Sequence, residues 1–187
     1  MLKPALIVLS LMVFISCKRN GESNVVNGEQ KESSSMVHTK QQAPRENVKT
    51  LDFKGFQPLL YKEDDKVHVI NFWATWCRPC VEEIPQFVKV MHESSMEGED
   101  IDVVFVSLDF AKDVESRLIP FAKKNGIFEN VVILDDPREN EWIPKVDKDW
   151  SGAIPATVIY KGKHRRFYEK PFVYKELKKE IEYFKEL

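Results

Sequence analysis

From about residue 48 onward, apolar residues occur in short runs separated by more polar segments. Val67–Trp73 and Ile101–Leu108 are nearly continuous runs of apolar residues, rich in β-branched and aromatic side chains. Such runs are typical of central strands that are buried on both faces. Shorter runs predict strands at Val48–Phe53 and Val131–Leu134, and a hairpin of Ala156–Tyr160 and Arg165–Glu169 around the turn Lys161-Gly162-Lys163.

Apolar residues three and four positions apart predict helices between these runs. The longest covers about Pro79 to Glu93, and its spacing continues past Pro85, so we expect this proline to kink the helix without ending it. Further helices are expected at Phe56–Tyr61, Asp113–Lys124, Asn140–Val146 and Phe172–Leu187, the last with an inward stripe of Val173, Leu177, Ile181 and Phe184. Strands separated by helices, then a hairpin and a final helix, predict an α/β fold whose central mixed β-sheet has helices on both faces.

The first 47 residues have a different pattern. Residues 1–16 combine Lys3 with an apolar run from Ala5 to Ile15 that is too short for a permanent membrane span, as in a secretory signal peptide. Residues 17–47 are mostly polar, which predicts a flexible tether. The folded domain is therefore expected at residues 48–187.

The segment Phe14-Ile15-Ser16-Cys17 resembles the end of a bacterial lipoprotein signal, although Phe14 stands where leucine is usual. This resemblance implies cleavage before Cys17, acylation of its thiol, and a protein that a lipid anchors to a membrane. A plain signal peptide followed by a free thiol is the alternative.

Composition excludes some functions. The 187 residues include 43% apolar side chains, enough for the core of one domain. The 28 basic and 30 acidic side chains nearly cancel, so we expect no nucleic-acid partner. The four histidines show no ligand spacing, and no second Cys or His pair accompanies Cys77 and Cys80, so we expect no metal.

The chemistry is expected at the Cys77-Arg78-Pro79-Cys80 segment, where a strand ends and a helix begins. At a helix N-terminus, free backbone N–H groups and the helix dipole stabilise a thiolate. Cys77 is thus the expected nucleophile, and Cys80 the thiol that resolves the mixed disulfide. Arg78 and Pro79 are expected to tune the redox potential, Arg78 by lowering the pKa of Cys77 unless it points into solvent.

Trp76-Cys77-Arg78-Pro79-Cys80, with Phe72-Trp73-Ala74 before it and Pro85 after it, resembles the thioredoxin superfamily. Ser151–Thr157 resembles the cis-proline segment of that superfamily. The resemblance implies a thioredoxin-like fold and a cis peptide bond before Pro155. It also implies that the backbone of Ile154 and the ring of Trp76 contact the substrate.

The leader and the pattern Cys77-x-x-Cys80-x-x-Glu83 resemble the TlpA/ResA-like, membrane-anchored thiol–disulfide oxidoreductases, over about residues 48–187. The resemblance implies that Glu83 lies beneath the cysteines, where it can take the proton from Cys80. Alternatively, Glu82 and Glu83 only complement the helix dipole. Asn71 stands where thioredoxin itself has a buried aspartate, and an amide cannot titrate.

These features predict an exported cell-envelope lipoprotein that faces the periplasm or extracytoplasmic space. We expect a monomeric protein-disulfide reductase whose only cofactor is the Cys77–Cys80 disulfide. Its substrates would be disulfides such as those of apocytochrome c or misoxidised proteins, and a membrane donor would supply electrons. Alternatives are a disulfide-forming oxidase and a copper-binding assembly factor that uses Cys77, Cys80 and His164. A peroxiredoxin is disfavoured, because Ala74 stands where that family has a threonine.

Overall fold

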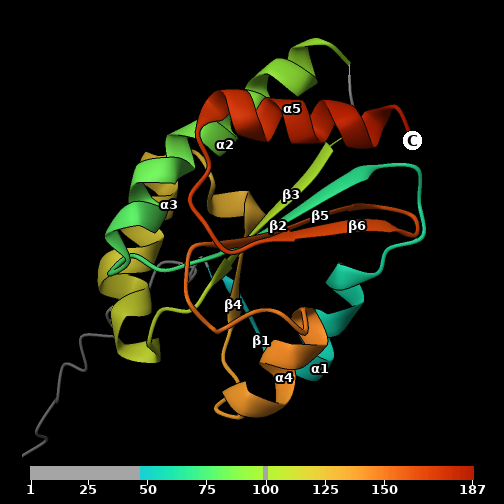
Figure 1. Ribbon diagram of the computed structural model, residues 1–187. Helices are drawn as coiled ribbons and strands as arrows, with labels where there is room; N and C mark the ends of the chain where they lie inside the picture. Colours follow the sequence, from blue (N-terminus) through green and yellow to red (C-terminus); the bar gives the residue numbers. More distant parts are fainter. Residues whose placement is uncertain (1–46, 99–100) are drawn as a thin grey trace, which may run out of the picture. The chain divides into compact units, whose positions relative to one another are not determined.

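The computed structural model describes residues 47–98 and 101–187 (Figure 1). The predicted signal peptide, Cys17 and all of the tether except Asn47 lie outside these residues. None of the helices within the described ranges is both long enough and apolar enough to span a membrane.

The described residues form a mixed β-sheet with the strand order β1-β4-β3-β2-β5-β6. The first four strands in this order run parallel, and the hairpin of β5 and β6 joins antiparallel to β2. Both predicted central strands are confirmed, and every residue of β2 is buried. In chain order the strands are β1 Lys49–Leu51, β2 Val67–Trp73, β3 Ile101–Ser107, β4 Val131–Leu134, β5 Ala156–Lys161 and β6 His164–Tyr168.

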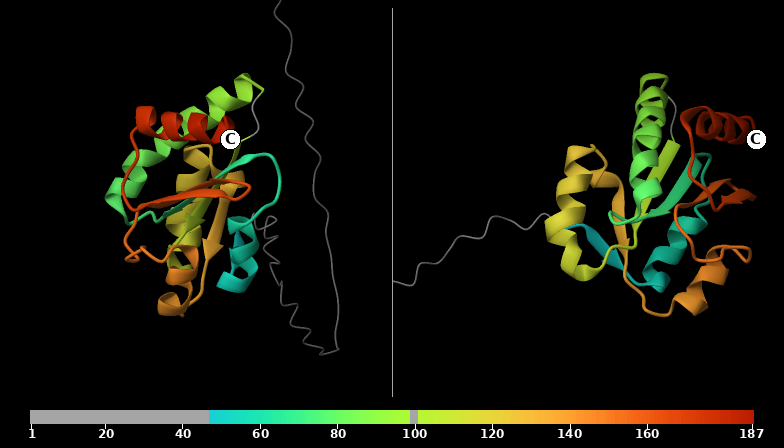
Figure 2. Two further views of the ribbon diagram at one scale, coloured as in Figure 1. Left: turned by 45° about the vertical axis from the view of Figure 1, so that its right-hand side comes forward. Right: turned by 60° about the vertical axis from the view of Figure 1, so that its left-hand side comes forward.

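Helices cover both faces of this sheet, as predicted (Figures 1 and 2). On one face, α2, α3 and α5 bury residues such as Phe87, Ala122 and Phe184. On the other face, α1 and α4 bury Phe56 and Trp142. The helices are α1 Phe53–Phe56, α2 Arg78–Met96, α3 Ile119–Lys124, α4 Glu139–Val146 and α5 Tyr174–Lys185, with 3-10 turns at Gln57–Leu60, Ala111–Asp113 and Phe128–Asn130.

The helix predicted from Asp113 to Lys124 does not form as one element. Val114–Leu118 is a π-helical turn, and regular α-helix begins only at Ile119. Pro120 follows directly, and proline has no N–H to complete the α-helical hydrogen bond to the preceding turn. By contrast, α2 continues through Pro85, as its apolar spacing predicted, and ends at Met96, three residues beyond the predicted Glu93.

Two other helix boundaries differ from prediction. The helix expected from Phe56 begins at Phe53, because the side chain of Asp52 caps it by accepting from the Gly55 N–H at 2.8 Å. The apolar stripe of α5 consists of Leu177, Ile181 and Phe184, without Val173. Val173 lies ahead of the helix with an extended backbone, and its side chain is 61% exposed. It is therefore not part of the apolar face that the helix turns toward the core.

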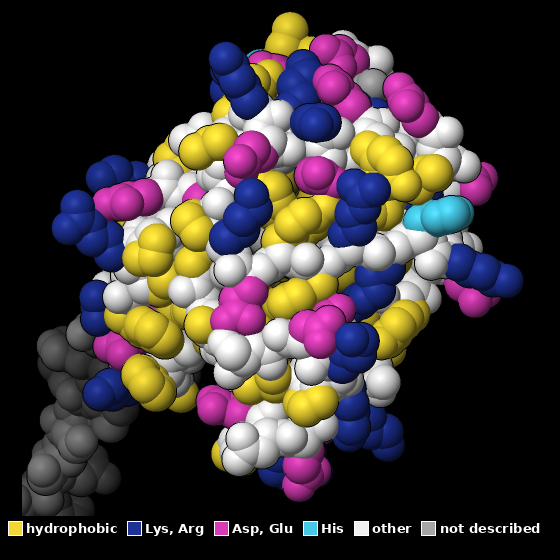
Figure 3. Space-filling view, in the orientation of Figure 1, with side chains coloured by type: hydrophobic (Ala, Val, Ile, Leu, Met, Phe, Trp, Pro, Cys, Tyr) yellow, Lys and Arg dark blue, Asp and Glu magenta, His cyan; other side chains and the backbone are white. Residues whose placement is uncertain are grey.

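Charged side chains of both signs are interspersed over the face of the molecule seen in Figure 3. This mixture agrees with the formal net charge of −2 for the chain. The face therefore presents no extended field of one sign that would steer a polyanion toward it.

His68 lies in an ionic cluster at the start of β2. Its ring is fully buried, with Nδ1 at 2.9 Å from Asp102 and Nε2 at 2.7 Å from Asp64. Carboxylates only accept hydrogen bonds, so both contacts are satisfied only when both ring nitrogens carry a proton. Burial disfavours the charged ring, but the hydrogen bonds to Asp102 and Asp64 outweigh it and raise the pKa of His68.

The raised pKa of His68 predicts a stability that depends on pH. A folded-state pKa above the ordinary value of 6.5 gives stability that is present below pH 6.5 and lost as the pH rises through the folded pKa. In urea unfolding of the disulfide form, we expect this loss in the wild type and in the exposed control His164→Gln. His68→Gln should lack it; equal slopes above pH 6.5 in all three proteins would contradict the assignment.

Candidate active site around the Cys77–Cys80 disulfide

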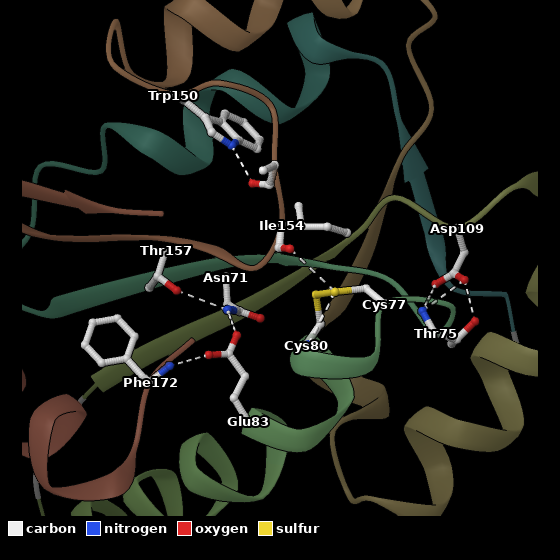
Figure 4. The surroundings of a disulfide bond; sticks show 11 residues. Asn71, Thr75, Cys77, Cys80, Glu83, Asp109, Trp150, Ile154, Thr157 and Phe172 are labelled. Atoms are coloured by element: carbon white, nitrogen blue, oxygen red, sulfur yellow. Dashed lines mark hydrogen bonds between the residues drawn. A yellow bond between two sulfur atoms is a disulfide. The ribbon is translucent and has the colours of Figure 1, made fainter. Parts of the chain in front are cut away.

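Strand β2 delivers Cys77 to the start of α2. After Trp73 the chain makes a tight turn, in which the Cys77 N–H donates to the Ala74 carbonyl at 3.1 Å. Cys77 is the N-cap of α2 and forms a disulfide with Cys80, their Cα atoms 5.3 Å apart. The predicted placement of the cysteines at a strand-to-helix junction is thus confirmed (Figure 4).

The two sulfurs have different surroundings. Cys77 retains 6% of its surface exposed, whereas Cys80 is fully buried. The Cys80 N–H donates to the Cys77 sulfur at 3.3 Å, an interaction that would also stabilise a thiolate there. Pro79 lies in the first turn of α2, where a missing N–H breaks no helical bond. Cys77 is therefore the sulfur placed to meet another molecule.

Arg78 points into solvent. Its side chain is 89% exposed and donates to Glu82 at 2.8 Å. Because water and salt screen exposed charges, and Glu82 neutralises this one, Arg78 acts only weakly on the Cys77 sulfur. The sequence allowed two orientations for Arg78. The structure has the one in which the side chain points into solvent, where its charge has little effect on the Cys77 sulfur.

The Ile154–Pro155 peptide bond is cis, as the resemblance implied. The Ile154 carbonyl oxygen lies 3.7 Å from the Cys77 sulfur, so the backbone of this loop borders the disulfide (Figure 4). The indole N–H of the buried Trp150 donates to the Ala153 carbonyl at 2.8 Å and holds the loop in place. Gly152 has φ of +93°, a conformation that favours glycine.

Trp76 is exposed next to Cys77, whereas Trp73 and Phe72 belong to the core, as predicted. The Trp76 ring is 48% exposed and stacks on that of Phe110, with 6.4 Å between their centroids. Phe110 was not among the predicted site residues. It lies three residues after the end of β3, which runs parallel to β2. The shared edge at which these two strands end was the available signal.

Glu83 is buried beneath the disulfide, one helical turn after Cys80 (Figure 4). Its Oε2 accepts from the Phe172 backbone N–H at 2.7 Å, and its Oε1 accepts from Asn71 Nδ2 at 2.9 Å. A carboxylate that only complemented the helix dipole would not need to leave the solvent, and burial costs it the solvation of water. The structure thus favours the interior position expected for Glu83, and Glu82 takes the solvent-exposed one.

Burial governs the acidity of Glu83. It raises the pKa of this carboxyl from 4.5 to about 7, although the hydrogen bonds from Phe172 and Asn71 act in the opposite direction. A carboxyl group that titrates near neutral pH can both accept and return a proton under ordinary conditions. The geometry therefore fits the acid–base role predicted for Glu83.

Asp109 anchors the turn before Cys77, a role that the sequence did not reveal. It is buried after β3 and accepts from the Thr75 N–H at 3.1 Å and from the Thr75 hydroxyl at 2.5 Å. The Ser107 hydroxyl donates to it at 2.9 Å. Thr75 thus directs its hydroxyl to Asp109, and Ala74 has none, so neither of these two positions offers Cys77 a threonine hydroxyl as in a peroxiredoxin.

His164 does not join the cysteines. It pairs with Lys161 at the turn of the β5–β6 hairpin, whereas Pro155 precedes the opposite end of β5. Within the residues that the structure describes, no cluster of three His, Cys, Asp or Glu side chains could hold a metal ion. The copper site considered from the sequence is therefore not assembled.

Comparison with known proteins gives the family. The model of the AhpC/TSA family matches residues 39–164, which is more than half of the chain. The chain belongs to the AhpC/TSA family. It is 37% identical over 82 residues to the thioredoxin-like protein YneN of Bacillus subtilis, covering 44% of this chain and 45% of that protein.

A second curated relative is the thiol-disulfide oxidoreductase ResA of Oceanobacillus iheyensis, 39% identical over 51 residues, which cover 27% of this chain and 26% of ResA. The chain thus spans less than half the length of both relatives. A thioredoxin-related protein of Neisseria meningitidis superposes with a TM-score of 0.54 at 22% identity, over 66% of this chain and 88% of that one. This likeness confirms the thioredoxin-like fold.

The raised pKa of Glu83 predicts how stability varies with pH. Between pH 4.5 and about 7 the folded state holds a proton that the unfolded state has lost, so stability falls as the pH rises across this window. The rise in pKa corresponds to a loss of about 3 kcal/mol. Urea unfolding should show this loss in the wild type and in the solvent-exposed control Glu82→Gln. Glu83→Gln should lack it, and a wild-type-like slope in that variant would refute the assignment.

Proposed function

We propose that this chain is a thiol–disulfide oxidoreductase that exchanges disulfides with protein substrates through Cys77 and Cys80. The observation that carries this proposal is a disulfide at the N-terminus of α2, bordered by the Ile154 carbonyl. The disulfide is itself the redox group, and the proposal needs no other cofactor. The relative named thiol-disulfide oxidoreductase supports the same activity.

In the proposed reduction, the Cys77 thiolate attacks a substrate disulfide and forms a mixed disulfide, and one substrate sulfur leaves as a thiolate. Cys80 then gives its proton to Glu83, attacks the Cys77 sulfur and releases the second substrate thiolate. Two electrons have passed to the substrate, and the Cys77–Cys80 disulfide has formed. Ile154, Pro155 and Trp76 are assigned to hold the substrate segment. The 3.7 Å approach of the Ile154 carbonyl oxygen to the Cys77 sulfur and the exposure of Trp76 next to Cys77 support this assignment.

For the setting of this reaction, we propose an extracytoplasmic, lipid-anchored protein of the TlpA/ResA-like branch. Support comes from the predicted leader of residues 1–16, which directly precedes Cys17, and from Glu83 three residues after Cys80. A reductase outside the cytoplasm requires a supply of electrons, so a membrane donor is part of the proposal. Its substrates would be disulfides of apocytochrome c or of misoxidised proteins, and the chain would act as a monomer.

Trapping tests the exchange chemistry. Cys80→Ala should accumulate mixed disulfides between Cys77 and a disulfide-bonded test protein, because the thiol that resolves them is missing. Non-reducing electrophoresis should show adducts that disappear with dithiothreitol. Both variants carry Cys17→Ser, and Cys77→Ala is the matched control; it should give no adduct, since its one remaining thiol, that of Cys80, is buried. If Cys80→Ala forms no more adduct than the control, the proposed activity is wrong.

The reduction potential tests the direction of electron flow. For a reductase we expect equilibrium with glutathione to favour the disulfide, at a potential below about −220 mV. A disulfide-forming oxidase would instead lie near about −120 mV. Mass spectrometry of alkylated protein after equilibration measures the ratio of dithiol to disulfide. A value near the higher figure would replace the proposed reductase by the oxidase.

A further inference from the structure

Asn71 has a buried amide oxygen without a hydrogen-bond partner in the described part of the chain. The residue is fully buried in β2, opposite Thr157 of β5. Its Nδ2 donates to Glu83 Oε1 at 2.9 Å and to the Thr157 hydroxyl at 3.1 Å, but its Oδ1 accepts nothing there. An unpaired buried acceptor is unfavourable, so a native fold that keeps one calls for an explanation.

The unpaired oxygen lies on the side of the disulfide. Figure 4 shows Oδ1 of Asn71 directed toward the Cys77–Cys80 bond, and Nδ2 directed toward Glu83 and Thr157. Cys80 and Glu83 are three residues apart on α2, so their side chains are neighbours on one helix face. A disulfide sulfur has no proton to donate. Reduction gives Cys80 an S–H group on the side toward which this oxygen is directed.

We propose that Asn71 is a positioning residue for the dithiol state, in which its Oδ1 accepts a hydrogen bond from the Cys80 thiol. We further propose that the amide turns over when the proton passes from Cys80 to Glu83, so that Nδ2 then donates to the Cys80 thiolate. The inference deepens the proposed oxidoreductase function and rests on it.

The side chains around Asn71 fit both orientations of the amide. With Glu83 ionised, Nδ2 donates to it and Oδ1 accepts from the thiol. After proton transfer, the Glu83 O–H and the Thr157 hydroxyl can both donate to Oδ1, while the Phe172 N–H still donates to the other Glu83 oxygen. The terminal torsion of asparagine has a broad, roughly two-fold profile, so either orientation is a natural one.

Proton balance is complete within this group. Reduction of the disulfide breaks one S–S bond and adds two electrons and two protons. Once Cys77 is joined to the substrate in the mixed disulfide, the Cys80 proton goes to Glu83. The Cys80 thiolate then attacks the Cys77 sulfur, and the substrate sulfur leaves as a thiolate. Glu83 faces Asn71 of β2, the Phe172 amide ahead of α5 and Cys80 of its own helix, while the Arg78–Glu82 pair points outward. No cation contacts Glu83 in the described residues. In the place of a cation, Glu83 has the Asn71 amide, which can form a hydrogen bond with the ionised or the protonated carboxyl group.

Substitution by an apolar side chain of similar size tests the inference. Asn71→Leu removes the acceptor for the thiol and the donor for the thiolate, so the equilibrium with glutathione should shift about tenfold toward the disulfide, about 30 mV. The Cys80 thiolate, followed by its ultraviolet absorbance in a background with both Cys17→Ser and Cys77→Ala, should form at higher pH. Asn140→Leu, an exposed control on α4, should match the wild type. Asn71→Val serves if the leucine variant does not fold.

A double-mutant cycle separates direct action on Cys80 from action through Glu83. If Asn71 contacts the sulfur, the shift in potential persists when Asn71→Leu is combined with Glu83→Gln. If the shift in potential disappears in the Glu83→Gln background, the inference is wrong. It is also wrong if Asn71→Leu changes only the stability in urea and leaves the potential unchanged. The glutathione equilibrium involves no protein substrate, so it stays informative even if trapping shows that the proposed substrate exchange is wrong.

Discussion

The position of β2 in the middle of the sheet is the constraint on which the site depends. Its seven residues are all buried, between the parallel strand β3 and the antiparallel strand β5. At its end, the Trp73 carbonyl accepts from the Leu108 N–H at 2.9 Å, so the pairing extends to the point where the chain leaves the sheet. The turn that follows brings Cys77 to the positive end of the α2 dipole.

The same strand carries Asn71 beneath the site, where a carboxyl group has been brought into the core. Ionised Glu83 loses the solvation of water and regains only two hydrogen bonds, which is why its pKa rises to about 7. The burial of Glu83 therefore lowers the free energy of unfolding at neutral pH. In the proposed mechanism, this carboxyl group is the acceptor for the proton of Cys80, at an interior position where water has little access.

Prediction from sequence succeeded where a local pattern is decisive. Val67–Trp73 is short, apolar almost throughout and rich in β-branched and aromatic residues, as is typical of a strand covered on both faces, and its predicted bounds agree with those of β2. It failed where one residue overrides the pattern. Pro120 breaks the expected helix because it lacks an N–H, and Val173 lies outside the helical period because the chain there is still extended. The solvent orientation of Arg78 depended on its pairing with Glu82, and the sequence left both orientations open.

The sequence by itself determined the α/β class, the placement of two cysteines at a strand-to-helix junction, and the proline segment that borders them. Each is encoded within a few neighbouring residues, by apolar period or by a short motif. Only the tertiary structure decided what surrounds the sulfurs. Asp109 holds the turn at Thr75, and the amide of Phe172, 89 residues from Glu83, holds its carboxylate. Such contacts follow from the order of strands and the packing of helices, which no local pattern specifies.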